Sequence, residues 1–220
     1  MTDTAQVFME AVTQGDTARV GEMLDQTPSL IETRSGQGGS ALMLALYYGQ
    51  RAMAEYLASR GAPLTIFEAT SLGRIEAVTA LLAEQPDLAH AYSPDGFQPL
   101  GYAAFFGQPA VADVLLAHGA DPNSPSRNAM RVRPLHSATA SGQLGIVQQL
   151  LAYGADPNAV QENDFTPLHN AAQNGDRAML QTLLQAGAQA EARSRDGRTA
   201  ADFAREAGHS EIAEWLMQSG

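Results

Sequence analysis

The sequence contains no cysteine and no lysine among its 220 residues. Without cysteine it has no disulfides, no thiolate zinc sites, no iron–sulfur clusters and no cysteine nucleophile. Without lysine it has no Schiff-base residue and no phosphate-loop lysine, which excludes much phosphate-transfer and aldol-type chemistry. The longest strongly apolar stretch, Ala41 to Tyr48, is far too short to span a bilayer. The start, Met1 to Thr4, lacks the features of a signal peptide, so we expect a cytoplasmic protein.

Basic charge is scarce as well. Thirteen arginines face 24 acidic residues, which gives a formal net charge of −11 and a pI near 4.7. Such a chain repels phosphate backbones and anionic lipid surfaces, so we expect neither nucleic acid nor a membrane as a partner. Aromatic residues make up only 6% of the sequence, although 45% of it is hydrophobic. This composition favours many thin, closely packed helical layers over one thick core.

The sequence repeats at a fixed period, which is its most informative property. Seven glycines are spaced by 34, 24, 34, 35, 33 and 33 residues. An alanine stands four residues before each of them, and a leucine or methionine stands eight residues after each. One helix pair cannot bury its apolar face alone, so the pattern predicts seven stacked units. We call these glycines the marker glycines: Gly15, Gly49, Gly73, Gly107, Gly142, Gly175 and Gly208.

Each unit has the signals of two short helices. In the sixth unit, Thr166 is suited to cap a helix that begins at Pro167, and Gly175 is suited to end it in a left-handed conformation. A second amphipathic run begins at Arg177 and stops at Gly187.

These residues resemble the ankyrin repeat. The run from Thr166 to His169, followed by Ala171-Ala172 and Gly187-Ala188, carries the resemblance, as does the fifth unit with Pro134-Leu135-His136 and Gly154-Ala155-Asp156. The resemblance covers residues 5 to 220 and is strongest from Asp95 onward. It implies an all-α, curved, right-handed solenoid in which each unit adds a short β-hairpin finger and two antiparallel helices. Fingers and first helices would then line a concave groove.

We predict a single domain over residues 1–220, with degenerate first, third and last units. The 24-residue step from Gly49 to Gly73 leaves no room for a finger, so Ala62 to Leu64 should lead almost directly into the next helix. We therefore expect a gap in the groove there. Binding of a small molecule in this gap, near Glu68, is one alternative function. The units lie near residues 2–33, 34–63, 64–91, 92–126, 127–160, 161–193 and 194–220.

The polar motifs favour structural roles over catalytic or metal-binding ones. The resemblance implies that His136 and His169 hydrogen-bond the neighbouring finger and a nearby threonine such as Thr166. The five histidines are scattered, so we expect no metal site, no cofactor and no catalytic residue. The glycine-rich run Ser35–Ser40 matches a finger turn better than a phosphate loop, and the two Asp-Pro-Asn sequences match turns better than calcium loops.

The aromatic residues give the most specific functional hypothesis. Under the resemblance, the two residues before a marker glycine face the groove, and finger tips lie beside them. We expect partner binding there, with Arg131 from a local arginine cluster assisting and Trp215 covering the end of the stack. The alternative for the aromatic residues is that their rings pack against neighbouring fingers. The alternative for the arginine cluster is that it belongs to a solvated finger without a binding role. The expected aromatic anchors are Tyr47, Tyr48, Phe97, Phe105, Phe106 and Phe165.

The function predicted from these features is a non-catalytic scaffold that binds a protein partner in its concave groove. A structural protein that self-associates through the aromatic surface or the ends of the stack is the second hypothesis. We expect a monomer, and nothing in the sequence supplies a nucleophile and base at interpretable spacing.

Overall fold

The computed structural model describes residues 4–36 and 38–218. Three parts of the chain lie outside the described residues: Met1 to Asp3 and Ser219 to Gly220 at the ends of the predicted domain, and Gln37 within the predicted turn at residues 35–40.

Fourteen α-helices occur in the described part of the chain and form seven consecutive pairs, which confirms the all-α prediction. The first and third pairs are each followed by a short 3-10 helix, η1 (Pro28–Glu32) or η2 (Pro86–His90), and η3 (Glu162–Asp164) lies in a later loop. The pairs are α1 (Thr4–Gln14) with α2 (Thr17–Gln26), α3 (Ala41–Tyr47) with α4 (Arg51–Ser59), α5 (Ile66–Leu72) with α6 (Ile75–Glu84), α7 (Pro99–Phe105) with α8 (Pro109–Ala117), α9 (Pro134–Ala140) with α10 (Leu144–Ala152), α11 (Pro167–Gln173) with α12 (Arg177–Gln185), and α13 (Ala200–Glu206) with α14 (Ser210–Gln218).

The small residues of the repeat let the layers approach closely. All seven alanines that precede the marker glycines by four residues are completely buried. Leucines in the second helices, such as Leu57, Leu115 and Leu150, are buried between neighbouring pairs. A methyl group at each alanine position leaves room for the backbone of the next helix, so the stack has no single thick core.

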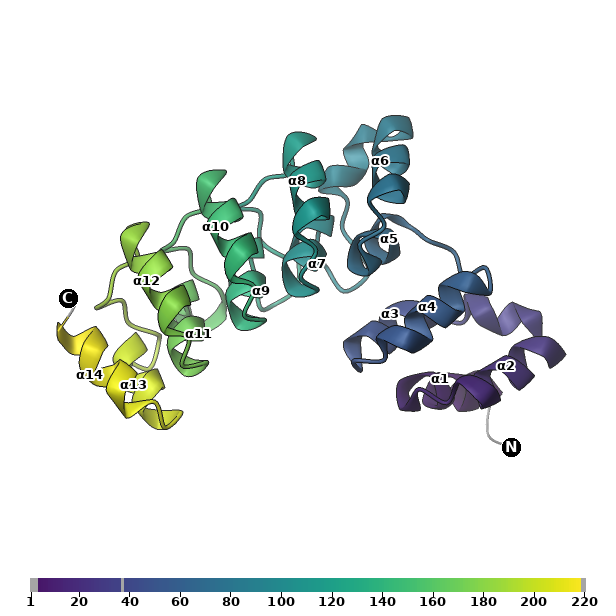
Figure 1. The fold of residues 1–220 in the computed structure, drawn as a ribbon, viewed down its shortest axis with the longest axis horizontal. Helices are drawn as coiled ribbons and strands as arrows, with labels where there is room; N and C mark the ends of the chain where they lie inside the picture. The colour runs from purple at the N-terminus through teal and green to yellow at the C-terminus, as the bar shows by residue number, and fades with distance from the viewer. Residues whose placement is uncertain (1–3, 37, 219–220) are drawn as a thin grey trace.

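The stack bends between α4 and α5, a boundary that we call the seam. Figure 1 shows the helix pairs in an arc, with α1 to α4 running across the direction of α5 to α12. The buried side chains divide into two clusters at this place, one mainly from Phe8 to Ala62 and one from Ile66 to Leu216. Only the short connection at residues 60–65 joins α4 to α5, so no finger is present there, as the 24-residue spacing predicts.

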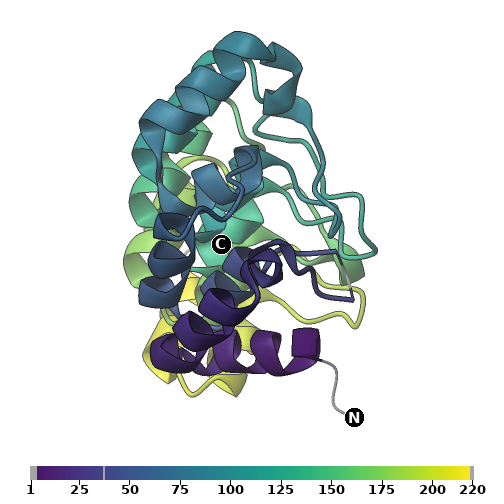
Figure 2. The ribbon, with the colours of Figure 1, turned by 90° about the vertical axis from the view of Figure 1, so that its right-hand side faces the viewer.

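The fingers are tight turns rather than strand pairs. Figure 2 shows the long connecting loops gathered on one side of the arc. In the described residues the sole β-bridge joins Arg34 to Ser40, because each finger is too short to form a ladder of hydrogen bonds. Later fingers are linked by one backbone hydrogen bond each, from Arg127 to Gly96, from Glu162 to Met130 and from Arg195 to Asn163, all 2.8 Å long.

This row of hydrogen bonds is interrupted at the seam. Pro94 occupies the finger position that Arg127 and Arg195 occupy in later fingers, and proline has no N–H to donate. Gly38 faces it so closely that a Cβ on Gly38 would lie 3.0 Å from Cβ of Pro94. The two halves of the stack therefore touch here without a backbone hydrogen bond between their fingers.

A marker glycine is needed both for its conformation and for its lack of a side chain. Gly73 has φ +76° at the end of α5, and Gln108 of the next pair lies over it. The Gln108 amide donates to the Ser71 carbonyl (3.0 Å), which caps α5. Gly49 has nearly the same φ, +72°, but apart from its two chain neighbours no described residue has an atom within 4 Å of the place where its Cβ would be.

Replacing Gly73 by alanine should therefore destabilise the protein more than replacing Gly49. Both substitutions force alanine into left-handed backbone, at a cost of about 1 kcal/mol. At Gly73 the new methyl group would also displace Gln108 and break its bond to Ser71, which adds roughly 1 kcal/mol. Urea unfolding of Gly73→Ala and Gly49→Ala measures the difference, and equal losses would contradict the role given to Gln108.

Candidate functional site

Six aromatic side chains form one connected group beside the seam, which we call the aromatic cluster. The ends of α3 and α7 bring Tyr47 within 6.3 Å of Phe105 and 5.6 Å of Phe106, measured between ring centroids. Tyr102, one turn before Phe106, stacks on it at 6.3 Å with the rings nearly parallel. Tyr102 and Phe67 are not among the aromatic anchors that the repeat pattern predicts. The complete cluster is Tyr47, Phe67, Phe97, Tyr102, Phe105 and Phe106.

Part of this aromatic surface is open to solvent. Tyr47 is 45% exposed, Phe105 is 43% exposed, and Tyr48, next to the cluster, is 63% exposed. Phe97 and Phe106 are half-buried. The exposed rings border a cleft of about 960 Å³, which we call the aromatic cleft. Its other walls are formed by the finger containing Pro94 and Asp95, the buried Tyr102, and the loop from Asn128 to Met130.

Asp95 connects the aromatic cluster to the finger row. Its carboxylate accepts hydrogen bonds from the Tyr47 hydroxyl (2.7 Å), the Tyr102 hydroxyl (2.5 Å) and the Ser93 hydroxyl. Because Tyr47 belongs to α3 and the other three residues follow the seam, this carboxylate joins the two halves of the stack.

The hydrogen bonds determine the protonation of this group. Burial alone would raise the pKa of Asp95, but the hydrogen bonds from Ser93, Tyr102 and Tyr47 outweigh it and hold that pKa below its ordinary value. Burial raises the pKa of Tyr47 and of Tyr102. At neutral pH the arrangement is therefore an ionised carboxylate held by protonated hydroxyls.

A second cleft, of about 460 Å³, lies where the finger is missing, and we call it the gap cleft. Arg34 and Glu68 are among the residues that line it. Glu68 is 3% exposed; its Oε1 accepts from the Ser40 hydroxyl (2.8 Å), and its Oε2 accepts from the Thr65 backbone N–H (3.0 Å) and the Thr65 hydroxyl. Both oxygens are thus occupied by groups that cap α5 and tie α3 to it.

The remaining predicted site residues lie away from the aromatic cluster. Phe165 packs 4.9 Å from His169 and 4.8 Å from Phe203, measured between ring centroids, and is half-buried. Arg131 is exposed, with left-handed backbone (φ +52°), and does not line the aromatic cleft. Trp215 is half-buried on α14 against the last layer of the core, with the Arg177 guanidinium 5.0 Å from its ring centroid.

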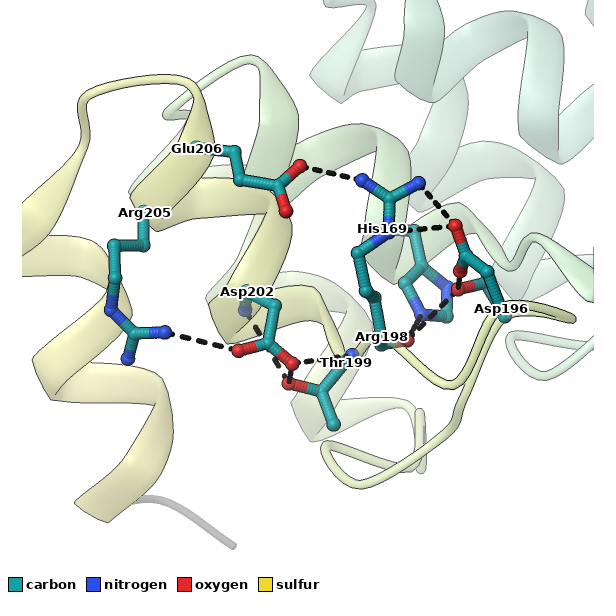
Figure 3. Close-up of polar contacts among 8 residues, drawn as sticks. His169, Asp196, Arg198, Thr199, Asp202, Arg205 and Glu206 are labelled. Atoms are coloured by element: carbon teal, nitrogen blue, oxygen red, sulfur yellow. Dashed lines mark hydrogen bonds and ion pairs between the residues drawn. The ribbon is translucent and has the colours of Figure 1, made fainter.

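His169 sits in a polar network between the last two fingers (Figure 3). Its Nδ1 accepts from the Thr166 backbone N–H (3.0 Å) and lies 2.8 Å from the Thr166 hydroxyl. The proton is therefore on Nε2, which donates to the Arg198 carbonyl (3.3 Å). This is the arrangement that the resemblance implies for this histidine.

His136 has only half of this arrangement. Its Nε2 donates to the Phe165 carbonyl (3.1 Å), but its Nδ1 has no hydrogen-bond partner in the described residues. Arg133 stands where the sixth unit has Thr166, so no hydroxyl caps the helix at this place. Within residues 4–36 and 38–218, no group of three or more His, Cys, Asp or Glu residues is arranged to hold a metal ion.

Two family models match the chain. The model described as "Ankyrin repeats (3 copies)" matches residues 135–220, and the model described as "Ankyrin repeat" matches residues 95–127. No curated protein matches the chain. None of the helices in the described part of the chain has both the length and the apolar character needed to cross a membrane.

The buried histidines should make the protein sensitive to mild acid. Burial lowers the pKa of His136 to about 4, and it also lowers the pKa of His169, while the unfolded chain binds these protons near the ordinary value of 6.5. The stability is therefore complete above pH 6.5 and falls as the pH drops toward 4, by up to roughly 3 kcal/mol from His136. Urea unfolding at several pH values measures this loss. His136→Gln should flatten the pH dependence of the free energy of unfolding, whereas the control His118→Gln, at an exposed helix end, should leave it unchanged. An unaltered pH profile in His136→Gln would refute the role given to His136.

Proposed function

Because the chain belongs to the ankyrin-repeat family, we propose that it is a non-catalytic module that binds a protein partner on the concave side of its arc. Ankyrin repeats are protein-interaction scaffolds in general, and no catalytic domain is found in the chain. The family assignment alone does not select a surface, because such arrays bind through side chains that differ from one member to another. The location of the partner site therefore depends on which side chains this chain exposes.

The observation that carries the proposal is the contiguous exposed aromatic surface at the ends of α3 and α7. Figure 1 shows α7, α9 and α11 on the inner side of the arc and α8, α10 and α12 on its outer side. Tyr47, Tyr48 and Phe105 expose between 43% and 63% of their surface around one cleft. Large apolar side chains grouped in this way on a monomer mark a contact surface, and tyrosine is enriched among the residues that dominate binding energy.

The aromatic residues have different roles in this proposal. Tyr48 and Phe105 are the main anchors, and Tyr47 is a rigid one because its hydroxyl is bonded to Asp95. Phe97 and Phe106 are half-buried and pack against other rings of the aromatic cluster, Phe97 against Tyr102 and Phe106 against Phe105, so they hold the exposed rings in position. A partner that continues along the groove would reach Phe165 and Arg131 as secondary contacts.

The same exposed rings could serve self-association, which is the alternative. Light scattering across a concentration series separates the two: we expect a monomer at every concentration. A mass that doubles with concentration, and that Phe105→Ala restores to the monomer, would favour self-association instead. The gap cleft gives less support to small-molecule binding, because the carboxylate of Glu68 is already engaged by Ser40 and Thr65.

Tyr48→Ala and Phe105→Ala should each weaken capture of the partner in a crosslinking pulldown by at least about tenfold, since a truncated anchor costs 2 kcal/mol or more. Tyr153→Ala is the matched control, because Tyr153 is 50% exposed at the end of α10, outside the aromatic cleft. Circular dichroism checks that each variant is folded. Undiminished capture by both folded variants would exclude the groove assignment.

A further inference from the structure

The finger that borders the aromatic cleft contains a carboxylate without a cation. Asp95 forms no ion pair in the described part of the chain. It is nonetheless half-buried, and among the described residues its carboxylate accepts hydrogen bonds from the side-chain hydroxyls of Ser93, Tyr47 and Tyr102. A partly desolvated charge of this kind gains energy when an opposite charge approaches it.

The last finger shows the same structural position with its charge neutralised. Ser93 and Ser194 each donate their backbone N–H across a turn, to the carbonyls of Phe97 and Arg198 respectively, both at 2.9 Å. In that turn Asp196 corresponds to Asp95, and Nε of Arg198 donates to Asp196 at 2.8 Å (Figure 3). At the aromatic cleft the equivalent of Arg198 is Phe97, so the turn is retained and the cation is replaced by a ring.

Apart from Asp95, the described residues that line the aromatic cleft are apolar or carry neutral polar groups. Asp95 is the one Asp, Glu or Arg side chain among the described residues lining the aromatic cleft, beside Tyr48, Phe105 and Met130. Asp95 also borders the gap cleft, which Arg34 and Glu68 line as well. Arg34 forms no ion pair with Asp95 and donates to the Gly38 carbonyl instead (3.2 Å). The chain as a whole carries a net charge of −11, which attracts basic partners and repels acidic ones.

This inference rests on the proposed function. We propose that the aromatic cleft recognises a segment of the partner protein that carries one basic and one large apolar side chain, and that the basic side chain, an arginine or a lysine, reaches Asp95. The cation would pair with the Asp95 carboxylate from the cleft side and neutralise it, as Arg198 neutralises Asp196. The exposed faces of Tyr47 and Phe105 would add cation–π attraction. A large apolar side chain next to the cation would fill the remainder of the cleft against Tyr48 and Met130.

Both parts of the segment contribute to specificity. The apolar side chain supplies buried area, and the cation supplies the discrimination against neutral or acidic sequences. An acidic segment would place a second negative charge beside Asp95, where no cation of this chain offsets it. A purely apolar segment would cover Asp95 and leave its charge desolvated and unpaired.

The probe for this proposal is a library of random linear peptides displayed on phage and selected on the intact protein. Enriched peptides are then synthesised, and their dissociation constants are measured by fluorescence anisotropy. Each peptide is also made with its arginine or lysine replaced by glutamine, which tests the charge without changing the protein. On the protein side, Phe97→Arg places a guanidinium where Arg198 stands in the last finger, and Phe97→Leu is its control.

We expect enriched peptides to combine arginine or lysine with a neighbouring large apolar residue. Replacing that basic residue by glutamine should weaken binding by about tenfold or more, whereas the exposed Asp87→Asn should leave binding within about twofold. Phe97→Arg should weaken binding by about tenfold more than Phe97→Leu, which removes the same ring without adding a charge. Peptides that need Tyr48 and Phe105 but keep their affinity after the glutamine replacement would overturn the cation assignment and leave the proposed function standing. Selection of no peptide that depends on Tyr48 or Phe105 would contradict both.

Discussion

Three hydroxyl groups converge on the carboxylate of Asp95 at the place where the stack lacks a finger. Elsewhere in the arc, each finger is joined to the next by a backbone hydrogen bond, and this link is impossible at Pro94. The side-chain bond from Tyr47 of α3 to Asp95 crosses the seam instead. The position of the aromatic cluster and the shape of the cleft depend on this bond, because it fixes the end of α3 against the finger before α7.

Hydroxyl donors leave the negative charge of a carboxylate in place, whereas an arginine at the same position neutralises it. Arg198 neutralises Asp196 in the last finger, which leaves a self-contained surface turn. At Asp95 the hydroxyls satisfy the oxygens but leave the negative charge in place. The seam is thereby stable without a partner and still electrostatically complementary to a basic one. The polar group that holds the two halves together thus also gives the apolar cleft its preference for a partner.

Local sequence signals predicted the features that depend on neighbouring residues. The alanine and leucine columns predicted the helix pairs and their buried faces, and the spacing between Gly49 and Gly73 predicted the missing finger. Arg133 in place of a threonine already indicates that the capping arrangement around His136 is incomplete. The i, i+4 spacing of Tyr102 and Phe106 was a further signal, which would have placed Tyr102 in the cluster.

The remaining features depend on contacts between residues far apart in the chain. Tyr47 and Asp95 are brought together by the bend at the seam, and no local pattern encodes the angle between the two halves. The separation of Phe165 from the aromatic cluster has the same origin, since its neighbour Phe203 belongs to the next unit. The fingers were expected as hairpins, but a turn closed by one or two hydrogen bonds is too short for strands.

The ionised state of Asp95 is the claim on which the account of partner recognition depends. A carbon-detected NMR titration of the Asp95 carboxyl group in the free protein measures it directly, with Asp95→Asn identifying the resonance. We expect a midpoint below the ordinary aspartate value of 3.8, because hydroxyl donors stabilise the charge. A midpoint above that value would contradict the role given to the hydroxyl donors, and a midpoint near or above pH 7 would leave no charge for a cation to pair with in the aromatic cleft.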